Sequence, residues 1–270
     1  MDKKKEKTGE KEEAAEKLQS RLENLLELGG SELRNAREHF QWISIIGQIE
    51  GHYALPEGQK ATKYEHIIPL LISVEEDDDI DGLLMILNTM GGDVEAGLAL
   101  AELVASMSKP TVSLVLGGGH SIGVPLATAA KYSLIVPSAT MTLHPVRING
   151  TVVGVPQSFR YMQEMQKRII GFICGHSTAK PETVNELMMR PDQLATDCGS
   201  VIDGAEAVRY GIINEVGGLD RALAVLRGMV KNKPAKNREN GNKFNHGSGE
   251  VKKKQKNEEN PTKNPAASIE

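Results

Sequence analysis

The sequence feature that most constrains the fold is a strand-like run that ends in a glycine-rich turn. Residues 111–116 are rich in apolar and β-branched side chains, which is typical of a buried strand. Gly117, Gly118 and Gly119 follow directly, and the small residues 127–130 then favour a helix. This stretch therefore predicts a strand, a tight turn and a helix in succession.

The same arrangement occurs one unit earlier in the chain. The apolar run 82–88 leads through Gly91 and Gly92 into a segment, 94–107, whose apolar positions favour a helix. Repeated strand and helix units predict an α/β fold with a parallel sheet. Because the carboxyl ends of parallel strands meet at one edge, both glycine turns should open on that edge, where such sheets bind ligands.

Other segments carry signals for turns and helix ends. Pro181 suits the first turn of a helix, and Pro69 predicts a kink or a late start in its own helix. Asp203 and Glu206 match an N-cap and its capping box, and Asn149-Gly150 is typical of a tight hairpin. We expect further strands at 42–49, 132–136, 140–143 and 212–216, and further helices at 64–75, 157–174, 181–189, between Asp203 and Gly211, and at 219–230.

The two ends of the chain differ in composition from the middle. Residues 1–38 are dominated by Lys, Glu and Arg, and residues 232–270 are polar with almost no apolar content. We therefore predict a single domain at 39–231 between flexible charged tails. Within the first tail, residues 11–28 carry an apolar stripe that predicts an amphipathic helix, which would pack against the domain or bind a partner.

Composition argues against several classes of protein. The net charge is only −4, and the Lys runs near both ends are interleaved with Glu, so no nucleic-acid partner is expected. No apolar run approaches the roughly 20 residues of a transmembrane helix, and the start of the chain lacks a signal-peptide pattern. With only two cysteines, we expect a soluble cytoplasmic protein with reduced thiols.

No cofactor or metal ion is expected. Neither glycine turn fits a dinucleotide-binding or Walker phosphate motif. The acidic run 75–79 lacks the glycine and the terminal glutamate of a calcium loop, so we interpret it as a solvated loop.

The second glycine turn carries a candidate nucleophile. Residues 119–123 fit the pattern G-x-S-x-G, in which the glycines allow a sharp turn and the serine hydroxyl is exposed. The backbone N–H after the serine can then face an oxyanion. The alternative is a plain connection in which Ser121 only caps the following helix.

A nucleophilic serine needs a base and a group that orients the base. His144 is the first choice for the base, because it ends the predicted strand 140–143 and precedes Pro145, which disfavours a helix. Asp197 is a candidate for the orienting group. The residues alone leave other bases open, namely His52, His66, His120 and His176.

Four segments, in this order, resemble the proteolytic subunit of the Clp protease. Residues 87–92 resemble its N-S-P-G-G turn, 121–123 the nucleophile in A-S-M-G, 143–145 the histidine in I-H-Q-P, and 206–213 its E-A-x-x-Y-G-L-I/V segment. The resemblance covers residues 40–228 and implies an α/β fold of the crotonase and ClpP-like type with a protruding strand and helix handle.

At the matching positions the resemblance implies the roles of a serine endopeptidase. Ser121 would be the nucleophile, His144 the general base, and the backbone N–H groups of Gly92 and Ile122 the oxyanion donors. Asp197 would complete a Ser-His-Asp triad, with a longer loop after it than the family has.

The chain departs from the family pattern at several positions. Asp192 and Asp203 stay open as alternatives to Asp197, although Asp203 is also explained as a helix cap. Met90 replaces the proline of the first turn, and His120 replaces a small residue beside the nucleophile.

The resemblance also implies partners. Peptides or unfolded proteins would be cleaved inside stacked rings of identical subunits, with the helix 157–174 and the preceding hairpin forming the handle between rings. The charged N-terminal segment does not resemble the family's short loops that meet an ATPase ring. It is more similar to the Clp-related branch of translocation-enhancing proteins in spore-forming Firmicutes. The family resemblance thus implies an ATPase as partner, and the similarity to this branch implies the secretion machinery as the alternative.

Three rival interpretations stay open. Acyl-CoA enzymes share the crotonase-like fold, but their carboxylates usually follow the second glycine turn, where this chain has Val124, Pro125 and Leu126. A serine-lysine peptidase would use Lys131, although His144 fits the serine-histidine pattern better. The third alternative is a non-proteolytic interaction protein on a protease fold.

Overall fold

A computed structural model of the chain describes residues 30–34, 38–148, 154–191 and 198–231. Several predictions concern residues outside these ranges: the helix at 11–28, the Asn149-Gly150 hairpin, Asp192, Asp197 and the polar tail from residue 232. They stay predictions, as do the proposed domain boundaries.

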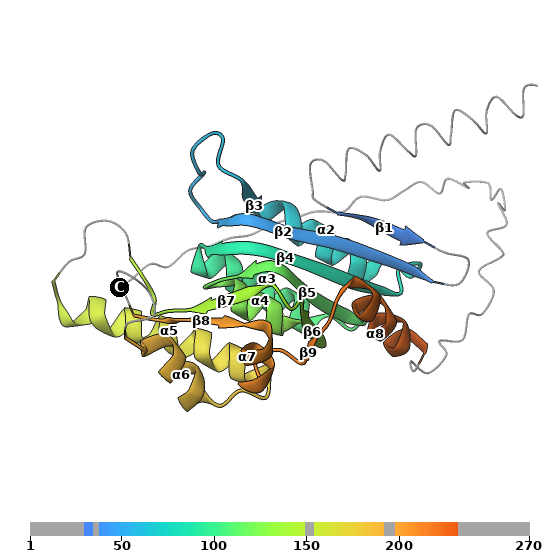
Figure 1. Cartoon of the computed structure of the whole chain (residues 1–270). Coiled ribbons are helices and arrows are strands. Elements are labelled where there is room, and N and C mark those ends of the chain that lie inside the picture. The colour runs from blue at the N-terminus through green and yellow to red at the C-terminus, as the bar shows by residue number, and fades with distance from the viewer. Residues whose placement is uncertain (1–29, 35–37, 149–153, 192–197, 232–270) are drawn as a thin grey trace, which may run out of the picture. The chain divides into compact units, whose positions relative to one another are not determined.

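A mixed sheet forms the centre of the described structure (Figure 1). Its strands lie in the order β1-β2-β4-β5-β6-β9, and all of them except β1 run parallel to their neighbours. Apolar runs without alternation, such as Leu83 to Leu87, form the central strands because helices cover both faces. The main-sheet strands are β1 (Gly30–Arg34), β2 (His39–Glu50), β4 (Gly82–Gly92), β5 (Thr111–Gly119), β6 (Tyr132–Ile135) and β9 (Glu215–Val216), and β3 (Ala61–Lys63) pairs with β2.

A second, smaller pairing lies beside the main sheet. β7 (Thr140–Leu143) and β8 (Ser200–Asp203) run antiparallel, with Leu143 opposite Ser200. β7 meets β5 at a single register position, where Gly118 lies opposite Thr140. This register brings the chain just before β8 next to the carboxyl end of β7.

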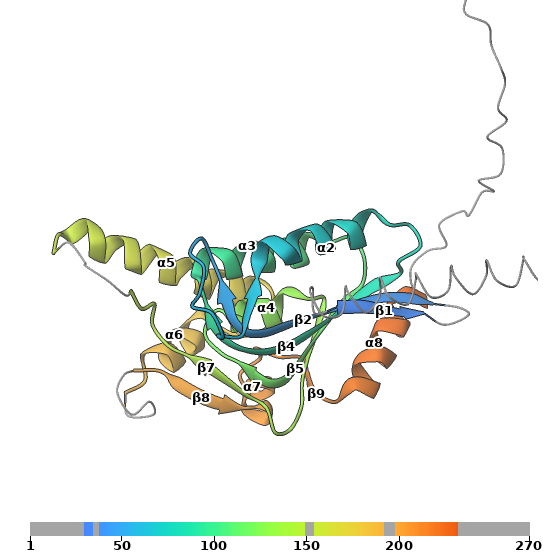
Figure 2. The ribbon, with the colours of Figure 1, turned by 90° about the horizontal axis from the view of Figure 1, so that it is seen from above.

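Helices cover both faces of the main sheet (Figure 2). α2, α3 and α4 pack on one face within a large apolar core, and α8 packs on the other through Ala222 and Leu226 against Phe40, Leu84 and Leu114. The helices are α2 (Tyr64–Glu76), α3 (Val94–Ser106), α4 (Gly123–Ala129), α5 (Pro156–Gly175), α6 (Pro181–Met189), α7 (Gly204–Arg209) and α8 (Leu219–Lys231).

The helix α5 has two halves with different surroundings. Its C-terminal half is buried through Met165, Ile169, Phe172 and Ile173. Its N-terminal half projects beyond the sheet in both views (Figure 1, Figure 2), where Phe159 is 61% exposed. The apolar stripe predicted for this helix is therefore buried in the core only along its C-terminal half.

Within the described residues, the predicted helices and the long strands are confirmed. α2 begins at Tyr64 despite Pro69, so the predicted late start is wrong. Pro69 is exposed, and water can bond the carbonyl that loses its helical partner. The predicted last strand, 212–216, is wrong in extent, because only Glu215 and Val216 pair with β6. The short strands β1, β3 and β8 were not predicted.

Candidate active site

The turn between β5 and α4 holds Ser121 in a left-handed backbone conformation, with φ of 55°. Among the described residues other than glycine, no other has a positive φ. Such a conformation costs a non-glycine residue about 1–2 kcal/mol. Two backbone hydrogen bonds hold it: the Ser121 N–H donates to the Thr142 carbonyl at 2.8 Å, and the His120 N–H donates to the Thr89 carbonyl at 3.1 Å.

The helix that follows is not capped by the serine. Its N-cap residue is Ile122, and no side chain accepts a hydrogen bond from the first turn of α4. The alternative in which Ser121 serves only as an N-cap is therefore wrong. The hydroxyl instead borders a cavity.

The first glycine turn packs directly against this serine. A Cβ on Gly91, where φ is 90°, would lie 2.7 Å from the Ser121 Cβ, and a Cβ on Gly92 would lie 2.2 Å from the Ile49 carbonyl oxygen. Both distances are far shorter than a Cβ tolerates. Gly91 is therefore required for the close approach of the β4 end to the serine turn, and Gly92 for its close approach to β2.

Both turns open into one cavity of about 360 Å³, as the sheet topology predicts. Ser121, Ile122, Gly91, Gly92 and His144 all line this cavity. The rest of its described lining is mostly apolar and comes from β2, β4, β7 and the segment after it, α3, α4, α5 and α6: Met90, Val94, Val124, Leu143, Pro145, Val146, Ile169 and Met188, together with Gln48 and Arg147.

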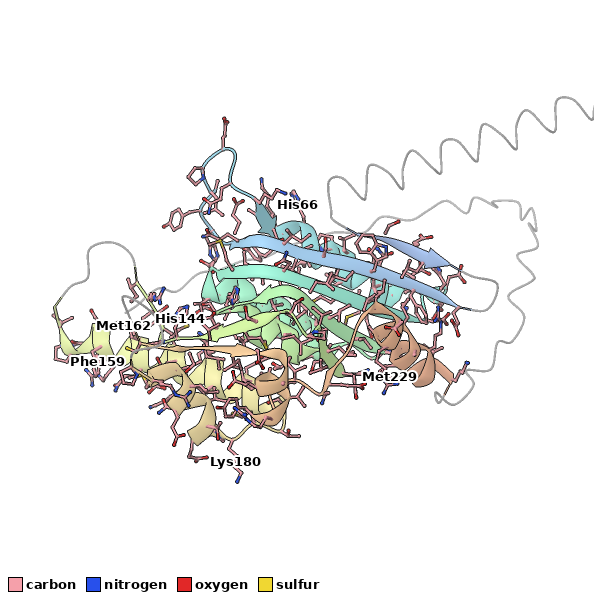
Figure 3. The ribbon with its side chains drawn as sticks, in the orientation of Figure 1. His66, His144, Phe159, Met162, Lys180 and Met229 are labelled. Carbon is pink, nitrogen blue, oxygen red and sulfur yellow. The ribbon has the colours of Figure 1, made fainter. Side chains whose placement is uncertain are left out.

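His144 leaves the end of β7 (Figure 3). Its Nδ1 lies 2.7 Å from the Pro145 carbonyl oxygen. A carbonyl oxygen can only accept, so Nδ1 carries the proton and Nε2 is the basic nitrogen. Within the described residues, no hydrogen bond joins Ser121 to His144, although both side chains border the same cavity. Such contacts are often long before substrate binds.

The backbone beside Ser121 offers an unpaired donor. Over the described ranges, the Ile122 N–H has no backbone acceptor, whereas the next two amides bond to the His120 and Ser121 carbonyls. An unpaired N–H next to a serine hydroxyl is the donor that an oxyanion requires.

The other predicted candidates have different surroundings. The Asp203 side chain accepts the Glu206 N–H at 2.8 Å and forms the predicted capping box of α7. Of the described histidines, only His144 lines the cavity. His66 lies on α2 (Figure 3), His52 packs near Tyr64, and His176 stacks on Phe172.

A larger cavity, of about 530 Å³, lies between α3 and α5. Its rim includes Glu95, whose pKa is lowered by the hydrogen bond from Arg168 at 2.8 Å. Its described lining contains neither a serine nor a cysteine, whereas the smaller cavity is lined by Ser121.

A protein-family model matches most of the domain. The model of the Clp protease family matches residues 36–219, which is more than half of the chain. The chain belongs to the Clp protease family.

Two curated relatives match this chain at different levels of sequence identity. The translocation-enhancing protein TepA of Halalkalibacterium halodurans is 52% identical over 211 residues, covering 78% of this chain and 82% of the relative. The ATP-dependent Clp protease proteolytic subunit of Lactococcus lactis is 23% identical over 157 residues, covering 56% of this chain and 74% of the relative.

A solved structure confirms the ClpP-like α/β fold. A mutant of ClpP1 from Listeria monocytogenes matches 67% of this chain and 94% of its own with a TM-score of 0.54 and 20% identity. In the part of the chain that the structure describes, no helix is long and apolar enough to cross a membrane.

Sequence reasoning missed two threonines at the site. Thr89 and Thr142 hold the Ser121 turn through their carbonyls, and the Thr142 hydroxyl lies 2.8 Å from the His120 ring. The alternation from Thr140 to His144 was a usable signal, because a period of two puts residue 142 on the face of residue 144.

Gly91→Ala should destabilise the domain by about 1–3 kcal/mol more than Gly58→Ala. The two glycines have similar φ values, 90° and 88°, but a Cβ at Gly58 has no atom within 4 Å. The control thus carries the same backbone strain without the contact to Ser121. Chemical denaturation measures both, and equal losses would contradict the packing of Gly91 on the serine turn.

Proposed function

We propose that the protein is a serine endopeptidase that cleaves peptides or unfolded proteins. The observation that carries this proposal is the shared cavity of Ser121 and His144, with Ser121 on a strained turn. The unpaired Ile122 N–H beside the serine supports an oxyanion site, completed by the Gly92 N–H.

In the proposed reaction, the Ser121 Oγ attacks the scissile carbonyl carbon while His144 Nε2 takes the hydroxyl proton. The Ile122 and Gly92 N–H groups stabilise the negative oxygen of the tetrahedral intermediate. His144 then protonates the leaving amine, and an acyl group remains on Ser121. Water activated by the same imidazole releases the acyl group and restores the serine.

Asp197 is proposed as the acid that orients His144. The antiparallel register of β7 and β8 supports it, because Leu143 lies opposite Ser200 and the chain continues from β8 back towards residue 197. The Gly199 N–H donates to the Arg190 carbonyl at 2.8 Å, so these two described residues on either side of 192–197 lie close together. Asp192 stays the alternative.

The lining of the cavity favours apolar substrate side chains. Met90, Val94, Val124 and Met188 surround the site, and its described lining holds no carboxylate. An acyl-CoA enzyme of the crotonase type would need such a carboxylate, so this observation favours the peptidase.

Assembly and location belong to the same proposal. The exposed N-terminal half of α5 supports stacked homo-oligomeric rings, whereas Ile169 and Ile173 belong to the protomer core. We propose a cytoplasmic protein that acts with an ATPase or the secretion machinery. The similarity to a relative named as translocation-enhancing supports the link to translocation.

The wild-type protein should react with a fluorophosphonate probe at Ser121. Ser121→Ala should lose the label and reduce peptide cleavage by at least about 1,000-fold, because triad residues act as a unit. Mass mapping of the labelled peptide and circular dichroism check the site and the fold. Ser138→Ala, at an exposed serine, is the control and should keep full activity. Labelling at another serine would exclude Ser121 as the nucleophile.

Asp197→Asn should lower kcat by about 10- to 1,000-fold, less than His144→Ala does. The smaller loss is expected because the Pro145 carbonyl still accepts the Nδ1 proton and keeps the imidazole in the basic tautomer. Asp192→Asn is the matched control, with wild-type kcat expected. A loss confined to Asp192→Asn would transfer the orienting role to that residue.

Phe159→Asp should split the assembly into smaller particles that keep their fold, because the new charge would be buried between subunits. Light scattering with circular dichroism measures size and fold together. Gln157→Asp adds the same charge on another side of α5 and should leave the assembly intact. A wild-type protein that is monomeric at micromolar concentrations would refute the ring proposal.

A further inference from the structure

The side chain of His120 contacts β7, the strand that ends directly before His144. His120 Nδ1 and the Thr142 Oγ1 are 2.8 Å apart. The Thr142 carbonyl accepts the Ser121 N–H, also at 2.8 Å. One residue of β7 therefore holds two consecutive residues of the serine turn, one through its side chain and one through its backbone.

The strand geometry links this contact to the base. β7 ends at Leu143, so Thr142 lies within the strand and two residues before His144. Met141 and Leu143, which alternate with them, are both buried in the core. A contact at Thr142 therefore restrains the end of β7, from which His144 extends.

The backbone connection between β5 and β7 is sparse, so an additional contact matters. The two strands share one register position, Gly118 with Thr140. β8 pairs along the whole of β7, but from the side away from the serine turn. Near the cavity, the hydrogen bonds that the structure describes between the serine turn and β7 are the Ser121 N–H bond and the His120 ring bond.

The position of the His120 ring depends on the absence of a side chain at Gly118. A Cβ on Gly118 would lie 2.6 Å from His120 Nε2, so a side chain there would displace the imidazole from its present position. The Gly118 N–H is fixed by the Asn88 side chain at 3.0 Å. Burial lowers the pKa of His120, which favours the neutral ring. In the tautomer with its proton on Nε2, Nδ1 accepts a hydrogen bond from the Thr142 hydroxyl.

We propose that His120 and Thr142 are positioning residues that hold β7, and with it His144, in register with Ser121. The inference rests on the proposed peptidase function, since it assigns the two residues to the alignment of nucleophile and base. It also gives a role to the histidine that replaces a small residue of the family pattern.

Two pairs of variants test the proposal. Thr142→Val removes the hydroxyl and keeps the side-chain shape, whereas Thr142→Ser keeps the hydroxyl. His120→Leu removes the ring nitrogen, whereas His120→Asn offers an amide atom near the position of Nδ1. The readouts are kcat and KM for a fluorogenic peptide with an apolar residue before the cleaved bond, and the rate of fluorophosphonate labelling at Ser121.

Loss of alignment should lower kcat and the labelling rate by about 10- to 100-fold in Thr142→Val and His120→Leu, because small misplacements of catalytic groups are costly. KM should stay within about two-fold, since the lining of the cavity is unchanged. Thr142→Ser and His120→Asn should recover most of the rate. Wild-type rates in Thr142→Val, or equal losses in Thr142→Val and Thr142→Ser, would overturn the proposal.

A structural measurement separates this inference from the proposed function. If the wild-type protein is not labelled at Ser121, the peptidase proposal fails. Crystal structures of the wild type and of Thr142→Val then still decide the positioning role. A Ser121 Oγ to His144 Nε2 distance that lengthens in the variant supports it, and an unchanged distance overturns it. If Thr142→Val does not fold, the His120→Leu and His120→Asn pair supplies the same comparison.

Discussion

The left-handed backbone of Ser121 is the constraint on which the rest of the site depends. A serine adopts this conformation only when neighbouring groups hold it, and here the carbonyls of Thr89 and Thr142 do so. Those carbonyls come from β4 and β7, two strands far apart in the sequence. The turn is therefore a junction of three strands, and none of them could shift without releasing the serine.

The glycines around this junction follow from the same crowding. Gly91 must approach the Ser121 Cβ, Gly92 must approach the backbone of β2, and Gly118 must leave space for the His120 ring. At each of the three positions, a Cβ would clash with a different neighbour. The glycine-rich composition of both turns thus reflects close backbone and side-chain packing, and it does not require a bound phosphate.

The helix α5 shows how one sequence pattern can meet two environments. Its apolar side chains recur at helical spacing along the whole helix, but the buried ones, Met165, Ile169, Phe172 and Ile173, all lie in its C-terminal half. Phe159 continues the stripe into solvent in this protomer. In a single chain, the surface around Phe159 stays exposed. For this reason we place the proposed contact between subunits on the N-terminal half of α5.

The sequence by itself determined the α/β class, the main helices and the long strands, because apolar runs, caps such as Asp203 and glycine turns act through near neighbours. It also singled out Ser121 and His144 as candidates. Only the tertiary structure decided that β1, β3 and β8 are strands, since three to five residues pair only when a distant partner presents its edge. It likewise decided which half of α5 is buried and that Thr142 contacts His120, because these contacts join residues whose proximity no local pattern encodes.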